Sequence, residues 1–424
     1  MYDPTQAPIT QLGETTYRHQ HQRFGLLPED RLRHIVILGK TGSGKSNLLA
    51  SVLAQDLAAG VGVVLLDPHG DLVEDVLPLV PRARRDSVRL LDARDREHPI
   101  SFNIFREAGG GATPAMVAAH LVTVFRRHWA DAWGPRLEHV LRQGVMAVAE
   151  DPRATLLFLY QFLTNDVLRK KVVGRLRDPL VRFFWATEFP RYARHEAEVL
   201  SPILNKLGAF LADPGIRHIV APERSRLQIG KLVREPGILL ARLAASDLGE
   251  QGSHLLGGLL VTAVQLHAWS RPRSGVPIYL VIDEFQHFVT DSLATLLSES
   301  RKFGVGLVLA HQYLGQLTPT LRDAVLGNVG SLIVFRVGAE DAAALAPELA
   351  PFTADDLQNL PRYEAVMKLL VRGQATRAFS ARTLPPSPVP ADAARARAAI
   401  VTASREQFTT SRDRVERLVA DRLR

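Results

Sequence analysis

The sequence contains no cysteine among its 424 residues. Without cysteine the chain cannot form a disulfide scaffold, use a thiol as a nucleophile or hold zinc through thiolates. It also has no uninterrupted apolar run of the ~18 residues that a membrane-spanning helix needs, because the nearest candidate, residues 254–269, is shorter and contains Gln265 and His267. The N-terminus lacks the basic and then apolar pattern of a secretory signal. We therefore expect a soluble, cytoplasmic protein without a membrane segment of its own.

The charge balance is positive, with a formal net charge of +8 and a sequence pI near 9.9. Clustered arginine neutralises phosphates and releases counterions, so such an excess favours an anionic partner such as nucleic acid. A well-solvated surface of mixed sign is the alternative that composition leaves open. The length and the 46% hydrophobic content indicate two or three domains with sizeable cores.

The most informative stretch is a strand, a glycine-rich turn and a helix in direct succession. Four aliphatic residues at 35–38 precede Gly39-x4-Gly44-Lys45-Ser46, and residues 47–58 carry helical spacing of apolar residues. This is the context of a Walker A loop, in which free backbone N–H groups and the helix N-terminus bind phosphates. A glycine-rich turn that binds nothing is the alternative. We expect the loop to bind ATP through Gly39, Thr41, Gly42, Ser43, Gly44, Lys45, Ser46 and Asn47.

A second motif is the apolar strand 279–282, which ends in Asp283 and Glu284. Asp283 and Ser46 are predicted to hold Mg²⁺, whereas Glu284 would polarise a water for attack on the γ-phosphate. This makes hydrolysis the expected reaction. One strand further on, Gln312 is placed to sense the γ-phosphate, unless it is only a surface amide at a strand end.

Strands and helices alternate in residues 35–106 and again from residue 237, which predicts a mainly parallel sheet with helices on both faces. The pattern between Pro114 and about residue 225 is helical. We therefore divide the chain into an N-terminal arm (1–33), the first part of an α/β core (34–110), an all-α insertion (111–225), the second part of the core (226–384), and a proline-rich linker with a C-terminal helix (385–424). The apolar stripe of that last helix suits docking on a partner surface, although fraying in solvent is the alternative.

Taken together, these motifs resemble the HerA/FtsK superfamily of ring-forming DNA-pumping ATPases, and within it the TraG/TraD-like coupling ATPases of conjugation and type IV secretion. The resemblance covers roughly residues 12–384. It is carried by the two Walker motifs and by Asp67-Pro68-His69-Gly70-Asp71, Pro99-Ile100-Ser101-Phe102-Asn103, Trp133-Gly134-Pro135-Arg136, Arg301-Lys302-Phe303-Gly304, His311-Gln312 and residues 336–341.

This resemblance implies a homohexamer of RecA-like P-loop cores that hydrolyses ATP with Mg²⁺ and moves single- or double-stranded DNA through a central channel. It also implies an arginine that enters the neighbouring subunit's site. Arg301 matches that finger position and Arg336 is a second candidate; Arg301 could instead cap its helix, and Arg336 could pair with Asp341. Residues 271–274 and 316–322 are candidate channel loops.

The chain departs from the membrane-bound coupling ATPases because it lacks their N-terminal membrane segments, so a membrane-anchored secretion or transfer partner is only a possibility that the resemblance raises. A HerA-like motor in DNA repair or defence is the first alternative. A protein-secretion ATPase and a nucleotide-gated scaffold without turnover belong to different functional classes. The response of the ATPase to DNA separates these hypotheses.

Overall fold

One large sheet organises the molecule. The computed structural model describes residues 8–16, 21–108, 112–129, 133–191, 196–272, 275–288 and 291–423. The 11 strands of the sheet lie in the order β2-β1-β13-β10-β9-β3-β8-β7-β4-β6-β5. The half from β9 to β5 is parallel, whereas β2, β1, β13 and β10 pair antiparallel with their neighbours. The predicted α/β class with a mainly parallel sheet is confirmed.

The parallel strands all lie within residues 35–106 or after residue 237, where the sequence analysis expects strands and helices to alternate. They are β3 (Ile35–Leu38), β4 (Gly62–Asp67), β5 (Val88–Asp92), β6 (Ile238–Arg242), β7 (Ile278–Ile282), β8 (Val305–His311) and β9 (Ser331–Val334). The antiparallel strands are β1 (Thr10–Thr15), β2 (Arg23–Leu26), β10 (Glu364–Lys368) and β13 (Phe379–Thr383), and a small separate hairpin joins β11 (Leu370–Val371) to β12 (Gln374–Ala375).

Helices cover both faces of the parallel half, which is why its strands are mainly apolar on both faces. In β3, Val36 and Leu38 belong to one apolar cluster and Ile35 and Ile37 to the other, as the alternation of a strand requires. The core helices are α1 (Pro28–Arg31), α2 (Lys45–Ala58), α3 (Asp71–Val76), α4 (Ile104–Glu107), α12 (Ile229–Arg234), α13 (Ala245–Leu248), α14 (Glu250–Ala268), α15 (Asp291–Glu299), α16 (Pro319–Asn328), α17 (Ala339–Leu345) and α18 (Ala354–Gln358). Two short 3₁₀ segments, η7 (Phe285–Phe288) and η8 (Ser300–Phe303), follow β7 and α15.

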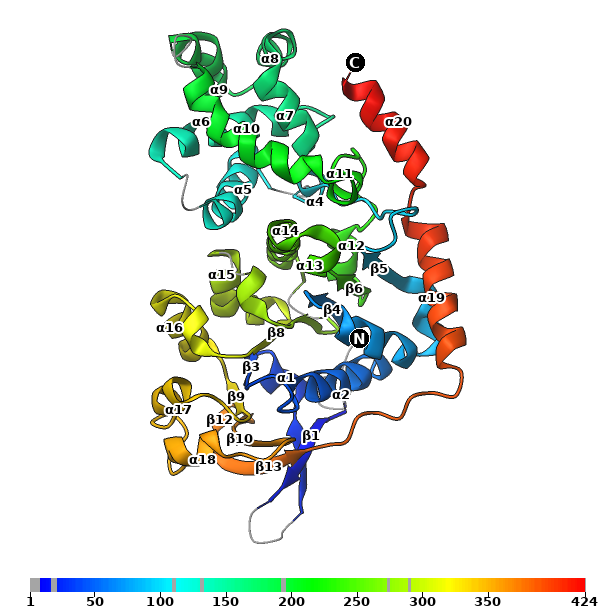
Figure 1. The fold of residues 1–424 in the computed structure, drawn as a ribbon, viewed down its shortest axis with the longest axis vertical. Helices are drawn as coiled ribbons and strands as arrows, with labels where there is room; N and C mark the ends of the chain where they lie inside the picture. Colours follow the sequence, from blue (N-terminus) through cyan, green and yellow to red (C-terminus); the bar gives the residue numbers. More distant parts are fainter. Residues whose placement is uncertain are drawn as a thin grey trace.

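The inserted segment forms a helical domain at one end of the molecule, next to α14 (Figure 1). Its apolar side chains belong to the same cluster as the α14 face of the sheet, so the domain packs directly on the core. The Asn103 amide strengthens this connection because it donates to the carbonyls of Ala154 and Glu223. The domain contains α5 (Pro114–His128), α6 (Pro135–Ala149), α7 (Leu156–Thr164), α8 (Asp166–Val173), α9 (Pro179–Phe183), α10 (Glu196–Ala212) and α11 (Pro214–Val220).

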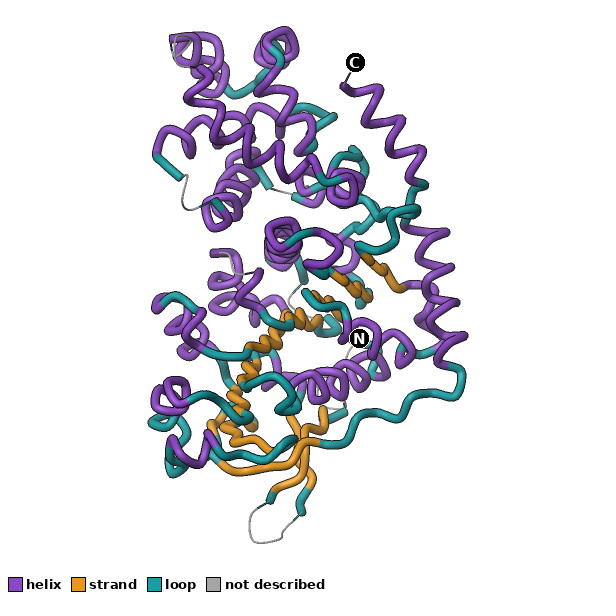
Figure 2. The backbone as a smooth tube through the Cα atoms, viewed as in Figure 1, coloured by secondary structure: helices purple, strands orange, loops and turns teal. Residues whose placement is uncertain are grey.

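Both ends of the chain differ from the simple arm and linker that the sequence suggested. In the described part of residues 1–33, β1 and β2 form a hairpin that extends the sheet through β13. After the linker, an unanticipated helix, α19 (Ala393–Phe408), packs against β5. The expected C-terminal helix, α20 (Arg412–Leu423), then runs beside the helical domain, as the backbone trace in Figure 2 shows. Its Val415 and Val419 are buried, so this helix docks within its own chain.

Within the described ranges, none of the helices combines the length and the apolar composition that crossing a bilayer requires.

Candidate nucleotide site

The turn between β3 and α2 has a shape that only glycine permits at several positions. Gly42 and Gly44 have φ angles of +75° and +125°, where other residues are strained. A Cβ on Gly39 would lie 2.6 Å from the Cβ of Phe335, and one on Gly44 would lie 3.1 Å from the Phe335 ring. Because Phe335 is fully buried, it has little room to move away.

Neighbouring strands hold this loop through main-chain hydrogen bonds. The N–H of Gly39 donates to the His311 carbonyl at 3.2 Å, and that of Lys40 donates to the Arg336 carbonyl at 2.8 Å. The loop is therefore fixed at the carboxyl ends of β8 and β9, the edge of a parallel sheet at which ligands bind.

Lys45 is the buried cation of the loop. Its ammonium donates to the Gly39 carbonyl at 2.5 Å. Burial lowers the pKa of Lys45, although the charges of Glu284 and Asp283 partly oppose that change. The ammonium thus lies between the loop and the acids at the end of β7, as expected for a group that binds the β and γ phosphates.

Asp283 lies at the tip of β7 and is only 7% exposed. Burial, assisted by the charges of Glu284 and Asp67, raises the pKa of Asp283 to about 6. Ser46 is exposed in the first turn of α2. A hydroxyl, a carboxylate and phosphate oxygens are the hard ligands that Mg²⁺ prefers. In the described part of the chain no three His, Cys, Asp or Glu side chains gather as a metal site, so Mg²⁺ would need the oxygens of the nucleotide as well.

Glu284 is an ionised carboxylate on a strained backbone, with a φ angle of +45°. Burial alone would raise the pKa of Glu284. The side chains of His311, Gln312 and Gln286 outweigh burial by favouring the carboxylate, and they lower its pKa to about 2. A carboxylate with so low a pKa is a weak base. It is therefore suited to orienting and polarising a water molecule rather than to accepting a proton from it.

The Gln312 side chain hydrogen-bonds the Glu284 carboxylate. Its sensing of a γ-phosphate stays a prediction. Glu284 has two further partners that the sequence analysis missed. Gln286 donates its amide to Glu284 Oε2 at 3.1 Å. Nδ1 of the fully buried His311 lies 3.5 Å from the same oxygen. Sequence signals for both existed, since His311 precedes Gln312 at the tip of β8 and Gln286 follows Glu284 by two residues.

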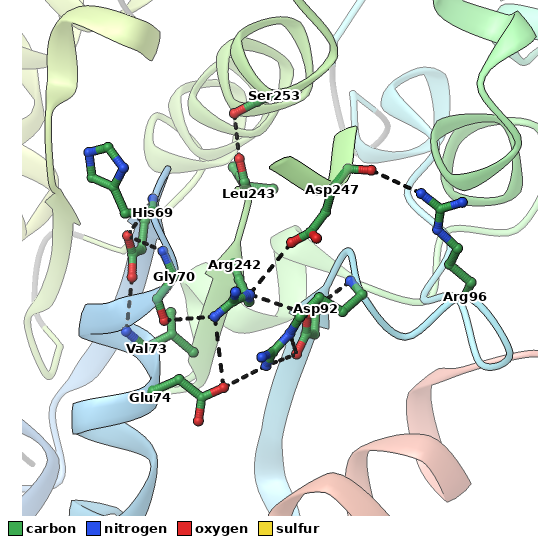
Figure 3. A network of polar contacts seen from close by, with 12 residues as sticks. His69, Gly70, Val73, Glu74, Asp92, Arg96, Arg242, Leu243, Asp247 and Ser253 are labelled. Atoms are coloured by element: carbon green, nitrogen blue, oxygen red, sulfur yellow. Dashed lines mark hydrogen bonds and ion pairs between the residues drawn. The ribbon is translucent and has the colours of Figure 1, made fainter. Parts of the chain in front are cut away.

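Asp67 at the tip of β4 shapes the next turn. Its carboxylate accepts hydrogen bonds from the backbone N–H groups of His69, Gly70 and Val73 at 2.7 to 3.0 Å (Figure 3). Beside this turn, Arg242 at the end of β6 donates to the Gly70 carbonyl at 3.2 Å. The Arg242 guanidinium also lies 3.7 to 3.8 Å from three carboxylates, those of Glu74, Asp92 and Asp247 (Figure 3).

One predicted loop residue, Asn47, has a side chain directed away from the loop. The Asn47 amide donates to the Leu384 carbonyl at 3.0 Å, and Thr41 is exposed. The proposed channel residue Arg271 is not available for DNA, because its buried guanidinium donates to the carbonyls of Val233, Val276, Phe303 and Gly304. Residues 273 and 274 of that candidate channel loop lie outside the described residues.

The two candidate finger arginines lie at opposite ends of the parallel strands: Arg336 is at their carboxyl ends and Arg301 is at their amino ends. Arg336 follows β9, has an exposed side chain and holds its own chain's loop through its carbonyl. The alternative pairing of Arg336 with Asp341 is not what the structure shows, since both Asp341 oxygens accept the Leu314 N–H. Arg301 is exposed in η8, immediately before β8. A seven-residue strand spans roughly 20 Å, so Arg301 cannot reach the loop of its own chain.

A basic cavity surrounds Arg301. It has a volume of about 480 Å³, and its lining includes the cations Arg33, Arg301 and Lys368. Lys368 is paired with Glu348 at 3.1 Å. His34 adds no charge, because burial lowers its pKa to about 4. Arg33 was missed by the sequence analysis, and it belongs to the same group as Arg301 only because β3 and β8 are neighbours.

Comparison with known proteins agrees with this geometry. A family model described as the type IV secretion-system coupling protein DNA-binding domain matches residues 21–349. A curated relative, the DNA double-strand break repair helicase HerA of Pyrococcus furiosus, is 23% identical over 384 residues. That alignment covers 79% of this chain but only 62% of the relative, so the chain spans less than two thirds of its length.

Solved structures show the same fold. The plasmid coupling protein TrwB in complex with ADP and Mg²⁺ superposes with a TM-score of 0.65 at 17% identity, covering 92% of this chain and 99% of the other. VirB4 of Thermoanaerobacter pseudethanolicus gives 0.62 at 17% identity, covering 92% and 98%. Because the family model matches most of its length, this chain belongs to the type IV secretion-system coupling protein family, with the fold of a HerA/FtsK-type P-loop ATPase.

Proposed function

We propose that the protein is an ATP- and Mg²⁺-dependent motor that moves DNA, working as a homohexameric ring. The observation that supports this proposal is that the expected catalytic residues lie at both ends of the parallel strands. Lys45, Asp283 and Glu284 lie at the carboxyl ends of the strands, whereas the cavity of Arg301 and Arg33 opens at their amino ends. If copies packed head to tail, the carboxyl ends of the strands in one copy would face the amino ends in the next. Heterologous contacts of this kind can close into rings.

In this arrangement each residue has a distinct role in hydrolysis. The loop and Lys45 would bind the phosphates, with Ser46 and Asp283 holding Mg²⁺. Glu284, oriented by Gln286 and Gln312, would polarise the attacking water. Mg²⁺, when bound, neutralises charge between the β- and γ-phosphates.

Arg301 of one copy, assisted by Arg33, would neutralise charge on the γ-phosphate held by the next copy. Arginine fingers contribute about 10³- to 10⁵-fold to turnover. An isolated subunit should therefore hydrolyse ATP poorly. Arg336, which lies beside its own loop, is the weaker finger candidate and suits contact with a nucleotide bound to the same chain.

DNA as the cargo is supported by the family assignment, by the name of the HerA relative and by the net charge of +8. The test is ATP turnover by the full chain with and without single- or double-stranded DNA. We expect stimulation at 50 mM salt that falls steeply by 200 mM, because contacts to phosphates release counterions. The Lys45→Ala variant should show no turnover under any of these conditions.

The HerA relationship makes a DNA-repair or defence motor the second candidate, since the same core would serve either process. Both motor functions require stimulation by DNA. Turnover that ignores DNA at low salt but rises with a substrate polypeptide would overturn them in favour of a protein-secretion ATPase.

A further inference from the structure

One aromatic residue, Tyr363, lies against the phosphate loop without any part in the chemistry described above. Its N–H donates to the Ser43 carbonyl at 2.8 Å. Its Cδ1 lies 3.0 Å from the position that a Cβ on Gly44 would occupy. On its other side, its carbonyl accepts hydrogen bonds from the N–H and hydroxyl of Thr383, at 2.9 and 3.3 Å. Tyr363 is therefore fixed between the loop and the end of β13.

The backbone of Tyr363 is strained, and this makes the choice of an aromatic residue informative. Its φ angle of +66° is one that glycine adopts freely and bulky residues adopt at a cost. The side chain is only half-buried, so completing the core does not account for the ring. The exposed Arg362 places its guanidinium 4.6 Å from the centre of the Tyr363 ring. Together they present a flat, cationic and partly exposed surface beside the loop.

The position of this surface relative to the loop identifies what it would contact. Lys45 and Glu284 mark the end of the site that takes the γ-phosphate. Since the loop N–H groups bind the α and β phosphates and Lys45 binds the β and γ phosphates, we expect the sugar and base beyond the α-phosphate, near Asn47 at the start of α2. The Asn47 amide is bonded to the carbonyl of Leu384, directly after Thr383, which in turn holds Tyr363. The Tyr363 ring therefore lies near the start of α2, where we expect the base.

We propose that Tyr363 and Arg362 form a stacking surface for the nucleobase of the bound nucleotide. The proposal rests on the function above only in that the loop binds a nucleoside di- or triphosphate. Stacking uses the π face that every base has, and it does not read the hydrogen-bonding edge. The surface thus adds affinity for purine nucleotides in general, and ADP and GDP should depend on it alike.

Calorimetric titration of the full chain with ADP, GDP and pyrophosphate, each with Mg²⁺, tests the proposal. Tyr363→Gly removes the ring and suits the positive φ, so the contact with Ser43 is retained. This variant should lower the affinity for ADP and for GDP by about 5- to 100-fold, the range for loss of one base–aromatic stack. Its affinity for pyrophosphate should stay within about 2-fold of the wild-type value. Tyr363→Phe should bind ADP with the affinity of the wild type, and Arg362→Ala should bind ADP about 2- to 5-fold more weakly. Phe183→Ala, an exposed aromatic on the helical domain, is the matched control.

Two results would overturn the proposal. Equal losses for ADP and pyrophosphate in Tyr363→Gly would mean that the residue only shapes the loop. Unchanged ADP binding would mean that the ring does not meet the base. The Lys45→Ala variant separates this from the function above, because it should weaken pyrophosphate and ADP together. If nucleotide binding depends on Tyr363 but DNA does not change the ATP turnover, the proposed DNA motor is wrong and the proposed stacking surface is retained.

Discussion

Glu284 is the residue on which the proposed hydrolysis would depend, because its carboxylate interacts with Lys45 and with the side chains of His311, Gln312 and Gln286. We expect Glu284→Gln to reduce ATP turnover by about 10²-fold or more, since the amide cannot polarise the water as a carboxylate does. ADP affinity, measured by calorimetry, should remain within a few-fold because the loop is untouched. Gln286→Ala, which removes only one hydrogen bond to the same oxygen, should cost about 10-fold or less. Equal turnover in wild type and Glu284→Gln would instead point to a nucleotide-gated scaffold.

His34 joins β3 to its neighbours as a neutral side chain. Its Nδ1 accepts the Leu307 N–H at 3.1 Å, and its Nε2 lies 3.0 Å from the Leu297 carbonyl. Burial lowers its pKa to about 4, and the nearby charge of Arg301 acts in the same direction. The unfolded chain, with an ordinary histidine pKa near 6.5, therefore binds a proton that the folded chain does not take up until about pH 4.

The stability that neutral His34 contributes is thus complete above pH 6.5 and is lost as the pH falls from 6.5 to 4, by up to about 3 kcal/mol. His34→Asn tolerates the φ angle of +68° and cannot titrate in this range. Urea unfolding across this window should give a shallower loss of stability for His34→Asn than for the wild type. The exposed His21→Asn should leave the slope unchanged. An identical slope in His34→Asn would contradict the assignment.

The sequence predicts those residues whose expected roles depend on local spacing. The loop with Lys45 and the acids after β7 could be predicted because the geometry of each lies within a few consecutive residues. Arg33 and Tyr363 could not, because their roles arise from strand order. Arg33 joins Arg301 only because β3 lies beside β8, and Tyr363 reaches the loop only because β10 lies two strands from β3.

Helix α20 is the element that connects the C-terminus to the helical domain. Val415 is 1% exposed against that domain, whereas Leu418 on the same helix is 47% exposed. We expect Val415→Ala to destabilise the docked helix by about 1–3 kcal/mol, because it removes buried methyl groups. Leu418→Ala should change it by less than about 0.5 kcal/mol. Amide hydrogen exchange within residues 412–423 measures the difference, and equal protection in both variants would show that α20 is not held by this face.

Elements with a strong pattern were predictable, and those whose stability comes from distant partners were not. The strands 35–38 and 278–282 are apolar runs buried on both faces, so composition predicts their bounds to within one residue. The buried face of α19 consists of Ala396, Ile400 and Ser404, which is a weak apolar signal. Ser404 is nevertheless fixed there, since its hydroxyl accepts the Leu90 N–H at 3.1 Å. The hairpin β1–β2 likewise depends on β13, more than 350 residues away in sequence.

In the proposed ring, a complete catalytic centre would require two copies of the chain, because Lys45 and Arg301 lie at opposite ends of the parallel strands. Each copy would contribute Lys45 to one interface and Arg301 to the other, so two inactive variants should complement each other. Lys45→Ala destroys the phosphate site and retains the finger, whereas Arg301→Ala does the reverse. Each variant alone should lose turnover by about 10³-fold or more. Lys302→Ala, the exposed neighbour of Arg301 that pairs with Glu299 at 3.0 Å, should remain close to wild type.

Mixing the two inactive variants in equal amounts should then restore activity. In a randomly mixed ring, a seam works only where an intact Lys45 meets an intact Arg301, which is the case for about a quarter of the seams. Turnover should therefore rise from background towards about a quarter of the wild-type rate. The double variant, Lys45→Ala with Arg301→Ala, should give no recovery when it replaces either partner in the mixture. If both single variants assemble like the wild type and their mixture stays inactive, Arg301 does not act across the seam, and the ring loses its main structural support.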